Sequence, residues 1–214
     1  MIADPDDAPE PRQRLLLAAE EIFAEKGFAS ATIREITDRA GANVAAINYY
    51  FGDKERLYIE AVRFAHSCAA KGMPLPPAPE AVSPVEKLKV FIHEMATRMT
   101  QPTRTSSLRL MMREMSQPTA AAHAIITEFI QPMAFGLRGI VRELLPTAPE
   151  SRILMIGFSI IGQILFYRQN RQVVELIFGK EPVDAITTPM IAEHVTRFAL
   201  AALGHGEPIR EAAP

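Results

Sequence analysis

The chain has 214 residues, of which 48% are hydrophobic and 22% charged, and its formal net charge is −2. A chain of this length can bury a full core, and it is long enough for one large domain or two small ones. Its single cysteine, Cys68, excludes an internal disulfide and fits a reducing cytoplasm. We interpret Cys68 as a packing residue, with a redox sensor as the alternative.

An acidic leader opens the chain, and we expect residues 1–11 to be a disordered tail. It contains Asp4, Asp6, Asp7 and Glu10, and it lacks the apolar run of a signal peptide. Residues 1–60 together carry seven Lys and Arg against twelve Asp and Glu. Because affinity for nucleic acid depends largely on the neutralisation of phosphates, charge alone argues against a DNA-binding protein.

The pattern over residues 12–57 argues the other way, because it predicts a helix-turn-helix. A first helix is expected to end near Phe28. Thr32 and Glu35 have the spacing of a capping box, so a second helix should begin at residue 33. Gly41 can take the left-handed conformation that ends this helix. The alternative is an ordinary helical hairpin within a core.

The next helix is predicted to follow Asn43, which can cap it, and to run to Phe51. Ile47, Tyr50 and Phe51 share one face and should dock on the core. The outward side chains before them are small, so the helix can enter a major groove, where Asn48 can pair with an adenine edge. The candidate DNA contacts are Thr32, Arg34, Asn43, Val44, Ala45, Ala46, Asn48, Tyr49 and Lys54.

This segment resembles the N-terminal domain of the TetR family of bacterial transcriptional regulators. The resemblance rests on Ile22–Phe28, Ala31–Ile36, Ala40–Ala42 and Tyr49–Phe51, followed by Lys54 and Leu57. It implies a DNA reader that works as a dimer on a palindromic operator. Many members have serine-x-glycine where this chain has Asn43 and Ala45, and tyrosine in place of Asn48. The base preference therefore cannot be carried over.

Beyond Leu57 every predicted element is a helix, so we predict an all-α protein. Helices are expected at residues 54–71, 84–100, 106–116, 119–145, 151–168, 172–178 and 189–203, with a kink at Pro132. Four prolines between residues 72 and 79 predict a loop. We therefore expect a helix-turn-helix domain at 12–57, a helical ligand-binding and dimerisation domain at 58–204, and a flexible tail at 205–214.

The most apolar stretch runs from Ile153 to Tyr167, about fifteen residues where a membrane span needs about twenty. It predicts a buried or interfacial helix of a soluble, cytoplasmic protein, with no membrane partner. An exposed face of this size would be a liability in a monomer. The family resemblance implies that helices near 151–168 and 189–203 pack against their copies in a homodimer.

A second resemblance covers Leu110–Met115 with Pro118–Thr119, and Ile161–Gln163 with Phe166–Arg168. These segments resemble the C-terminal domain of the CecR branch of TetR regulators, which implies a small-molecule effector. Methionines suit an adaptable pocket, although each is also an ordinary core residue. Arg113 could hold an anionic or carbonyl group, or simply face solvent. The candidate effector contacts are Met95, Met99, Met112, Arg113, Phe129, Gln163 and Phe166.

No cofactor or catalytic site is predicted. The five histidines have no paired ligand spacing, which argues against a metal site, and no nucleophile, carboxylate pair or phosphate loop stands at usable spacing. We therefore predict a non-enzymatic repressor whose affinity for its operator falls when a small molecule binds. The alternative is a helical adaptor or ligand-binding protein without DNA-binding activity.

Overall fold

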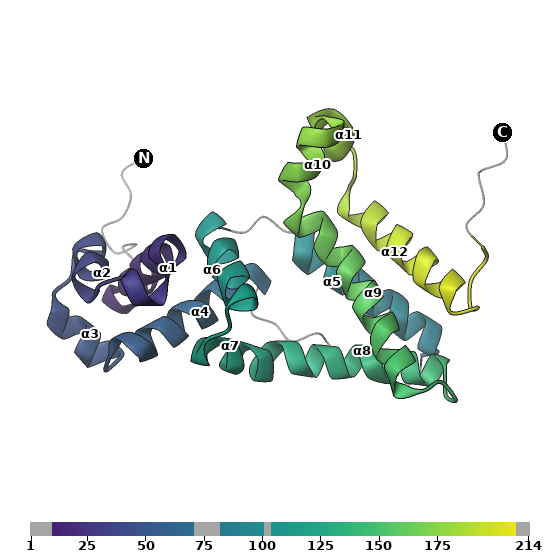
Figure 1. The fold of residues 1–214 in the computed structure, drawn as a ribbon, viewed down its shortest axis with the longest axis horizontal. Helices are drawn as coiled ribbons and strands as arrows, with labels where there is room; N and C mark the ends of the chain where they lie inside the picture. Colours follow the sequence, from purple (N-terminus) through teal and green to yellow (C-terminus); the bar gives the residue numbers. More distant parts are fainter. Residues whose placement is uncertain (1–9, 71–81, 101–103, 209–214) are drawn as a thin grey trace. The chain divides into compact units, whose positions relative to one another are not determined.

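The computed structural model describes residues 10–70, 82–100 and 104–208, and over these residues it consists of helices joined by short turns, without a strand (Figure 1). This confirms the all-α prediction. The predicted loop 72–79, residues 1–9 of the leader and the Cys68 side chain lie outside the described residues. The helices are α1 (Pro11–Ser30), α2 (Ile33–Ala40), α3 (Val44–Tyr50), α4 (Lys54–Ala70), α5 (Pro84–Thr100), α6 (Thr105–Ser116), α7 (Ala120–Ile125), α8 (Gln131–Leu144), α9 (Glu150–Gln169), α10 (Arg171–Phe178), α11 (Lys180–Asp184) and α12 (Thr188–Ala202).

The chain divides into two compact units, each built from two separate stretches of sequence. Unit 1 comprises Met1–Met73 and Pro102–Glu128, and unit 2 comprises Pro74–Gln101 and Phe129–Pro214. The helix-turn-helix segment therefore does not form a unit by itself. Helices α4 and α6 pack against α1, and α7 packs against α4 and α6.

Helix α1 is the centre of unit 1, because α2, α4 and α6 all pack against it. Its buried face includes Leu15, Ile22 and Phe23. At Gly27 the helix is interrupted by a residue with φ 76° and ψ 171°, a conformation that only glycine adopts easily. This kink redirects the chain towards α2.

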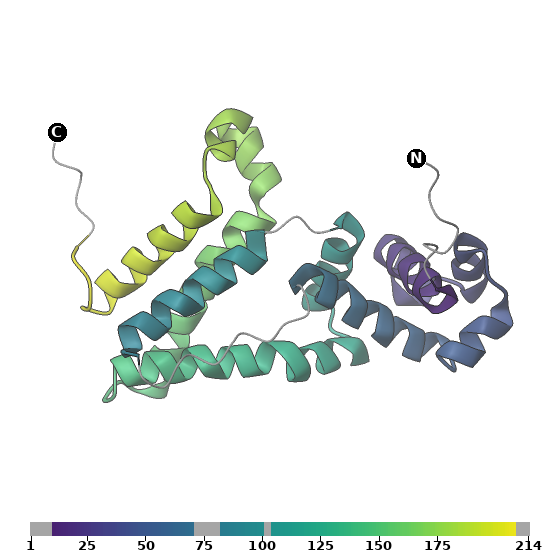
Figure 2. The same ribbon diagram turned by 180° about the vertical axis from the view of Figure 1, so that it is seen from behind.

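Unit 2 is held by an apolar core between α5, α8, α9 and α12. Helix α12 lies along α5, as the view from behind also shows (Figure 2). The core residues recur at helical spacing, for example Leu88, Ile92 and Met95 on α5. This spacing explains why the sequence predicts these helices well.

Three details of the helices after residue 118 differ from the predictions. The expected single helix 119–145 contains a π-helical turn at Ile126–Ile130, directly before Pro132. Proline has no N–H and its ring clashes with the carbonyl four residues earlier, so a wider turn is a physical alternative to a kink. Helix α9 begins at Glu150, one residue earlier than expected, and α11 was not predicted.

Candidate DNA-binding interface

The start of α2 is fixed by a complete capping box. The Thr32 hydroxyl accepts a hydrogen bond from the Glu35 N–H at 3.2 Å, and the Glu35 carboxylate accepts from the Thr32 N–H at 3.0 Å. Lys26 donates to the same carboxylate. The hydrogen bond from Lys26, followed by those from Thr32, lowers the pKa of Glu35 to about 2. The carboxylate therefore stays charged at the start of α2, where it complements the helix dipole.

The turn between α2 and α3 is set by two residues that the sequence singles out. Gly41 ends α2 in the left-handed conformation, with φ 61° and ψ 42°. Asn43 caps α3, since its side-chain oxygen accepts from the Ala46 N–H at 2.9 Å. Local side chains thus define both ends of the turn.

Helix α3 presents one face to the core and the other to solvent. Ile47 is 1% exposed and Phe51 is also buried, as expected. Tyr50 was expected to dock on the core too, but it lies at the surface with its ring in edge contact with that of Tyr49. Val44, Ala45 and Asn48 are exposed, and Tyr49 is 81% exposed. A short helix with this outward face suits a major groove.

Basic side chains flank α3 from both neighbouring helices. Most cations of unit 1 lie within ion-pair distance of carboxylates, such as Arg39 with Glu21 at 3.2 Å. Arg34 on α2 is exposed and has no ion pair among the residues that the structure describes. Lys54, at the start of α4, lies over the ring of Phe28 with its ammonium 4.7 Å from the centroid. These two cations remain available for phosphates.

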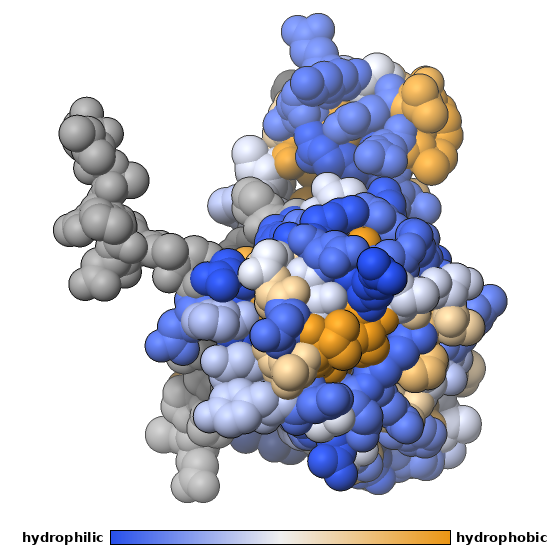
Figure 3. All heavy atoms as spheres, turned by 90° about the vertical axis from the view of Figure 1, so that its left-hand side faces the viewer, coloured by the Kyte–Doolittle hydropathy of each residue, from blue (hydrophilic) through white to orange (hydrophobic). Residues whose placement is uncertain are grey.

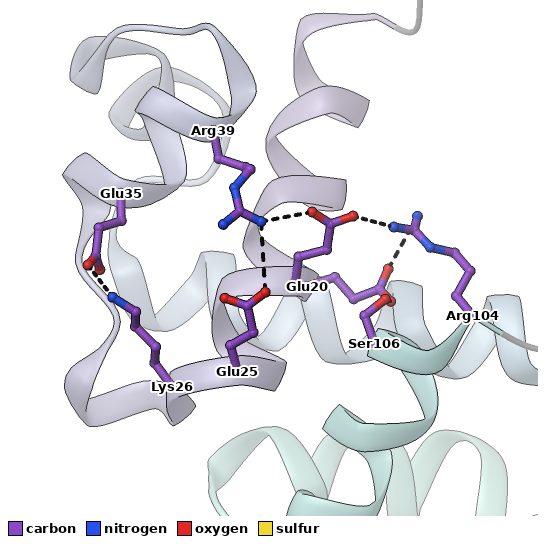
Figure 4. A network of polar contacts seen from close by, with 8 residues as sticks. Glu20, Glu25, Lys26, Glu35, Arg39, Arg104 and Ser106 are labelled. Atoms are coloured by element: carbon purple, nitrogen blue, oxygen red, sulfur yellow. Dashed lines mark hydrogen bonds and ion pairs between the residues drawn. The ribbon is translucent and has the colours of Figure 1, made fainter.

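Helix α6 is attached to α1 by a buried carboxylate. Glu20 is fully buried, and its Oε1 accepts from the hydroxyls of Ser106 at 2.7 Å and Ser107 at 2.6 Å, in the first turn of α6. Figure 4 shows Glu20 beside Ser106 and Arg104. Arg104, the residue before α6, lies 3.7 Å from Glu20 Oε2 and donates to Glu21 at 2.8 Å. A carboxylate at a helix N-terminus is favoured by the helix dipole. Glu20 thus supplies a negative group that α6 lacks in its own first turn.

The other end of α6 makes two further polar contacts within unit 1. Glu114 is fully buried, and it accepts from the Tyr58 hydroxyl on α4 and from the Thr119 hydroxyl at 2.7 Å. Burial, followed by the hydrogen bond to Glu114, raises the pKa of Tyr58. Arg113 lies over the Gly27 kink, where a Cβ added to the glycine would stand only 2.5 Å from the Arg113 Nη1. Helix α6 therefore fixes both the kink of α1 and the start of α4.

Comparison with known proteins assigns the family. Residues 15–61 match the profile of the bacterial regulatory proteins of the tetR family, and residues 84–203 match the C-terminal domain of the HTH-type transcriptional dual regulator CecR. The second match alone covers more than half of the chain. The chain belongs to the CecR branch of the TetR family. Like the other TetR-family regulators it is a DNA-binding transcriptional regulator, not an enzyme.

Individual relatives agree with this assignment. The regulator is 29% identical over 196 residues to CecR of Shigella flexneri, a match that covers 86% of this chain and 87% of CecR. It is 34% identical over 77 residues to the transcriptional repressor AcnR of Corynebacterium efficiens, covering 34% of this chain and 41% of AcnR. A TetR transcriptional regulator from Agrobacterium tumefaciens shares the fold, with a TM-score of 0.57 at 17% identity over 91% of this chain and 94% of that one.

TetR-family regulators bind operators, typically dimerise and respond to small molecules, and they are in general soluble cytoplasmic proteins. Two stretches of this regulator, Ala120–Leu144 and Glu150–Gln169, have the length and composition of membrane spans. Core helices of soluble proteins pass the same test, so this is weak support for a membrane role. Among the described residues no group of three or more His, Cys, Asp or Glu side chains could hold a metal.

The candidate effector residues of this regulator fall into both units. Met112, on the surface, and Arg113 belong to unit 1. In unit 2, Met95 is buried in the core and Phe166 is largely exposed. Gln163 donates to the Ser159 carbonyl of its own helix at 3.3 Å. Phe129 begins the second stretch of unit 2.

In unit 2 the predicted effector residue Met99 lies next to Arg168, which the sequence did not identify as a candidate contact. Arg168 donates to the carbonyl oxygen of Met99 at 3.3 Å and lies 3.9 Å from its sulfur. Burial lowers the pKa of this guanidinium. The hydroxyl of Thr100, the residue after Met99, lies 2.6 Å from the hydroxyl of Thr188, the first residue of α12. Arg168 bounds the apolar stretch of the sequence, and a basic residue at such a boundary is the signal that could have identified it.

Proposed function

We propose that this regulator represses transcription as a homodimer whose two α3 helices read a palindromic operator. The observation that supports this most directly is the outward face of α3, where Asn48 and Tyr49 project while Ile47 holds the helix to the core. Arg34 and Lys54 flank it as phosphate contacts. Thr32, Asn43 and the small residues Val44, Ala45 and Ala46 complete the proposed interface. The relatives include a repressor, AcnR, and a dual regulator, CecR.

The dimer is proposed to form through α9 and α12. Between Arg152 and Arg168, helix α9 has no charged residue, yet Met155, Phe158 and Phe166 are more than half exposed. Met190 and Phe198 are exposed on α12. An uncharged, solvent-facing helix of this length is expected to be covered by another apolar surface. A two-fold partner with the same face meets that need.

DNA titration tests the reading helix. The purified full chain is titrated against the DNA upstream of its own gene, with random DNA of the same length as competitor. We expect Asn48→Ala to lose about 1–3 kcal/mol of binding free energy and to relax selectivity, because a base contact is removed. The Tyr49→Ala change should weaken binding as well. Equal affinity of the native chain for both DNAs would refute the proposal.

Salt dependence tests the flanking cations. The slope of log K against log salt is negative, and each phosphate that is no longer neutralised should reduce its magnitude by about 0.9. Arg34→Gln and Lys54→Gln should therefore each give a shallower slope. Arg109→Gln is the matched control, since Arg109 is an exposed arginine of α6 with no ion pair among the described residues. If all three changes lower the slope equally, general charge rather than direct phosphate binding explains the effect.

For the effector we propose a small molecule bound in unit 2 that lowers the affinity for DNA. Its affinity must differ between the DNA-binding and non-binding shapes, since only this difference shifts the equilibrium. Met95, Met99, Gln163 and Phe166 remain candidates, and the half-buried guanidinium of Arg168 is added to them. A set of hydrophobic carboxylates can be screened by thermal shift, with Arg168→Gln as the variant expected to lose the response. A response that Arg168→Gln retains would remove Arg168 from the site.

A further inference from the structure

Helix α10 exposes almost all of its apolar side chains. Leu176 is 88% exposed, Phe178 68% and Ile177 65%, and Val173 is more than half exposed. In the space-filling view a group of hydrophobic side chains lies on the upper lobe, where α10 and α11 are found (Figure 3). Within the part of the chain that the structure describes, the main neighbours of α10 are α9 and α11. Nothing in the proposed DNA reading or effector binding uses these residues.

The charges around α10 argue against an anionic partner. The only basic residue of the helix is Arg171, which forms ion pairs with Glu175 at 2.9 Å and with Asp184 of α11. Helices that lie on membrane surfaces carry a strongly basic polar face, and nucleic acid needs cations that are free to pair with phosphates. The surface of α10 is instead apolar with internally neutralised charges, which suits another apolar protein surface.

A second copy of the chain fits this surface best. Helix α10 follows α9 after a single residue and packs against it, so its exposed apolar side chains lie next to the helix proposed for the dimer. Obligate homodimers bury about 1,000 Å² or more per partner, about two thirds of it apolar. The large exposed side chains of α9 and α12 offer on the order of 500 Å² and those of α10 about as much again, taking about 200 Å² for each large side chain. With α10 the face reaches the size of a stable dimer.

We propose that α10 is a dimer arm, which packs Val173, Leu176 and Ile177 against a second copy of this chain. The inference rests on the homodimer of the proposed function and adds a contact outside α9 and α12. Because each copy carries the same arm, a two-fold dimer buries two of them. Helix α11 packs against α10, and the ion pair between Arg171 and Asp184 connects the two helices.

The test is the dimer dissociation constant of the full chain, measured by sedimentation or mass photometry. The double change Leu176→Glu with Ile177→Glu should raise it at least 100-fold, because four carboxylates would enter the interface. Helix content by circular dichroism should stay unchanged, since both side chains face solvent within one chain. Gln172→Glu, at an exposed position of the same helix, is the control for added charge and should leave the constant within threefold.

A second double variant separates the effect of changed packing from that of added charge. Leu176→Met with Ile177→Val keeps the surface apolar and should leave dimerisation within threefold. If the Glu variant dimerises as tightly as the native chain, α10 is no dimer arm. Phe158→Glu on α9 then distinguishes the dimer arm from the dimer through α9 and α12. If Phe158→Glu abolishes the dimer and the α10 variant does not, the proposed function stands and only the dimer arm is refuted. Cosedimentation of the native chain with phosphatidylglycerol vesicles, abolished in the Leu176/Ile177 Glu variant while the dimer is unaffected, would assign α10 to lipid and overturn the inference.

Discussion

The two units of this regulator are stabilised by different kinds of contact. Of the buried polar or charged residues described, Glu20, Thr37, Ser107 and Glu114 lie in unit 1 and only Thr196 lies in unit 2. Both buried carboxylates therefore join helices of the unit that reads DNA. The core of unit 2 is a continuous apolar cluster. Hydrogen bonds are directional and apolar packing is not, so the two units differ in how narrowly their helices are positioned.

This difference matches what each unit has to do. A reading helix must meet base edges at hydrogen-bond distance, and a small change in the direction of α2 and α3 would break those hydrogen bonds. Unit 2 is the unit proposed to bind the effector, and an apolar core that can repack would help it to do so. Four substitutions can break or sharpen this comparison.

The largest effect is expected for Glu114→Ala. The change leaves the buried Tyr58 hydroxyl and the partly buried N–H and hydroxyl of Thr119 without their acceptor, and a buried polar group without a partner costs about 1–3 kcal/mol. We expect unfolding free energy to fall by about 3 kcal/mol, measured by urea denaturation. Glu114→Gln keeps one acceptor oxygen and should lose about half as much. Equal losses in the two variants would show that charge, not hydrogen bonding, is what Glu114 contributes.

Gly27→Ala should come next, at about 2 kcal/mol, because it places a side chain at φ 76° and against the Arg113 guanidinium. Operator affinity should fall with it, since the kink directs α2 and α3. The control is Gly204→Ala, at φ 74° with no neighbour within 4 Å. Comparison of the two by thermal unfolding isolates the effect of Arg113. A Gly27→Ala protein with native operator affinity would show that the kink does not set the direction of the reading helix.

Thr196→Val tests unit 2 and should have the opposite sign. The Thr196 hydroxyl is buried, and no hydrogen-bond partner for it lies among the described residues. Replacing it with a methyl group of similar shape should raise the unfolding free energy by about 1 kcal/mol, because an unsatisfied polar group is removed from an apolar core. Urea denaturation gives the value. A destabilised variant would mean that the hydroxyl has a hydrogen-bond partner. The core of unit 2 would then depend on polar contacts, as unit 1 does.

The smallest effect is expected for Glu35→Gln, and it should depend on pH. Glutamine keeps the capping box but loses the charge that pairs with Lys26. The pKa of Glu35 is about 2 in the folded protein against an ordinary value of 4.5, so its contribution is complete above pH 4.5 and is lost as the pH falls towards 2. The difference in melting temperature between the variant and the native chain should therefore shrink over that range. A difference that is constant with pH would contradict this assignment.

The parts of the DNA-reading site that the sequence predicts are those set by near neighbours. Thr32 and Glu35 cap α2 three residues apart, and Gly41 and Asn43 shape the turn that follows them. Such contacts leave a pattern at fixed spacing. The boundaries of α2 and α3 could therefore be predicted to within about a residue.

The parts that could not be predicted depend on distant partners. Glu20 meets Ser107 across 87 residues of sequence, and Tyr58 meets Glu114 across 56. In the sequence, Glu20 and Glu114 look like ordinary surface residues of amphipathic helices. Arg113 was considered as an effector contact because it stands in an apolar helix, and only the fold shows that it lies against Gly27.

The split composition of unit 1 limits how this regulator can be recombined with others. A fragment ending at Ala70 would separate Glu20 and Tyr58 from their partners on α6, so it would not carry a complete reader. A chimeric repressor that borrows this DNA specificity has to include residues 104–128 with the N-terminal stretch, and it should join the foreign effector domain after Glu128. Transplantable specificity here is thus encoded in two distant pieces of the gene.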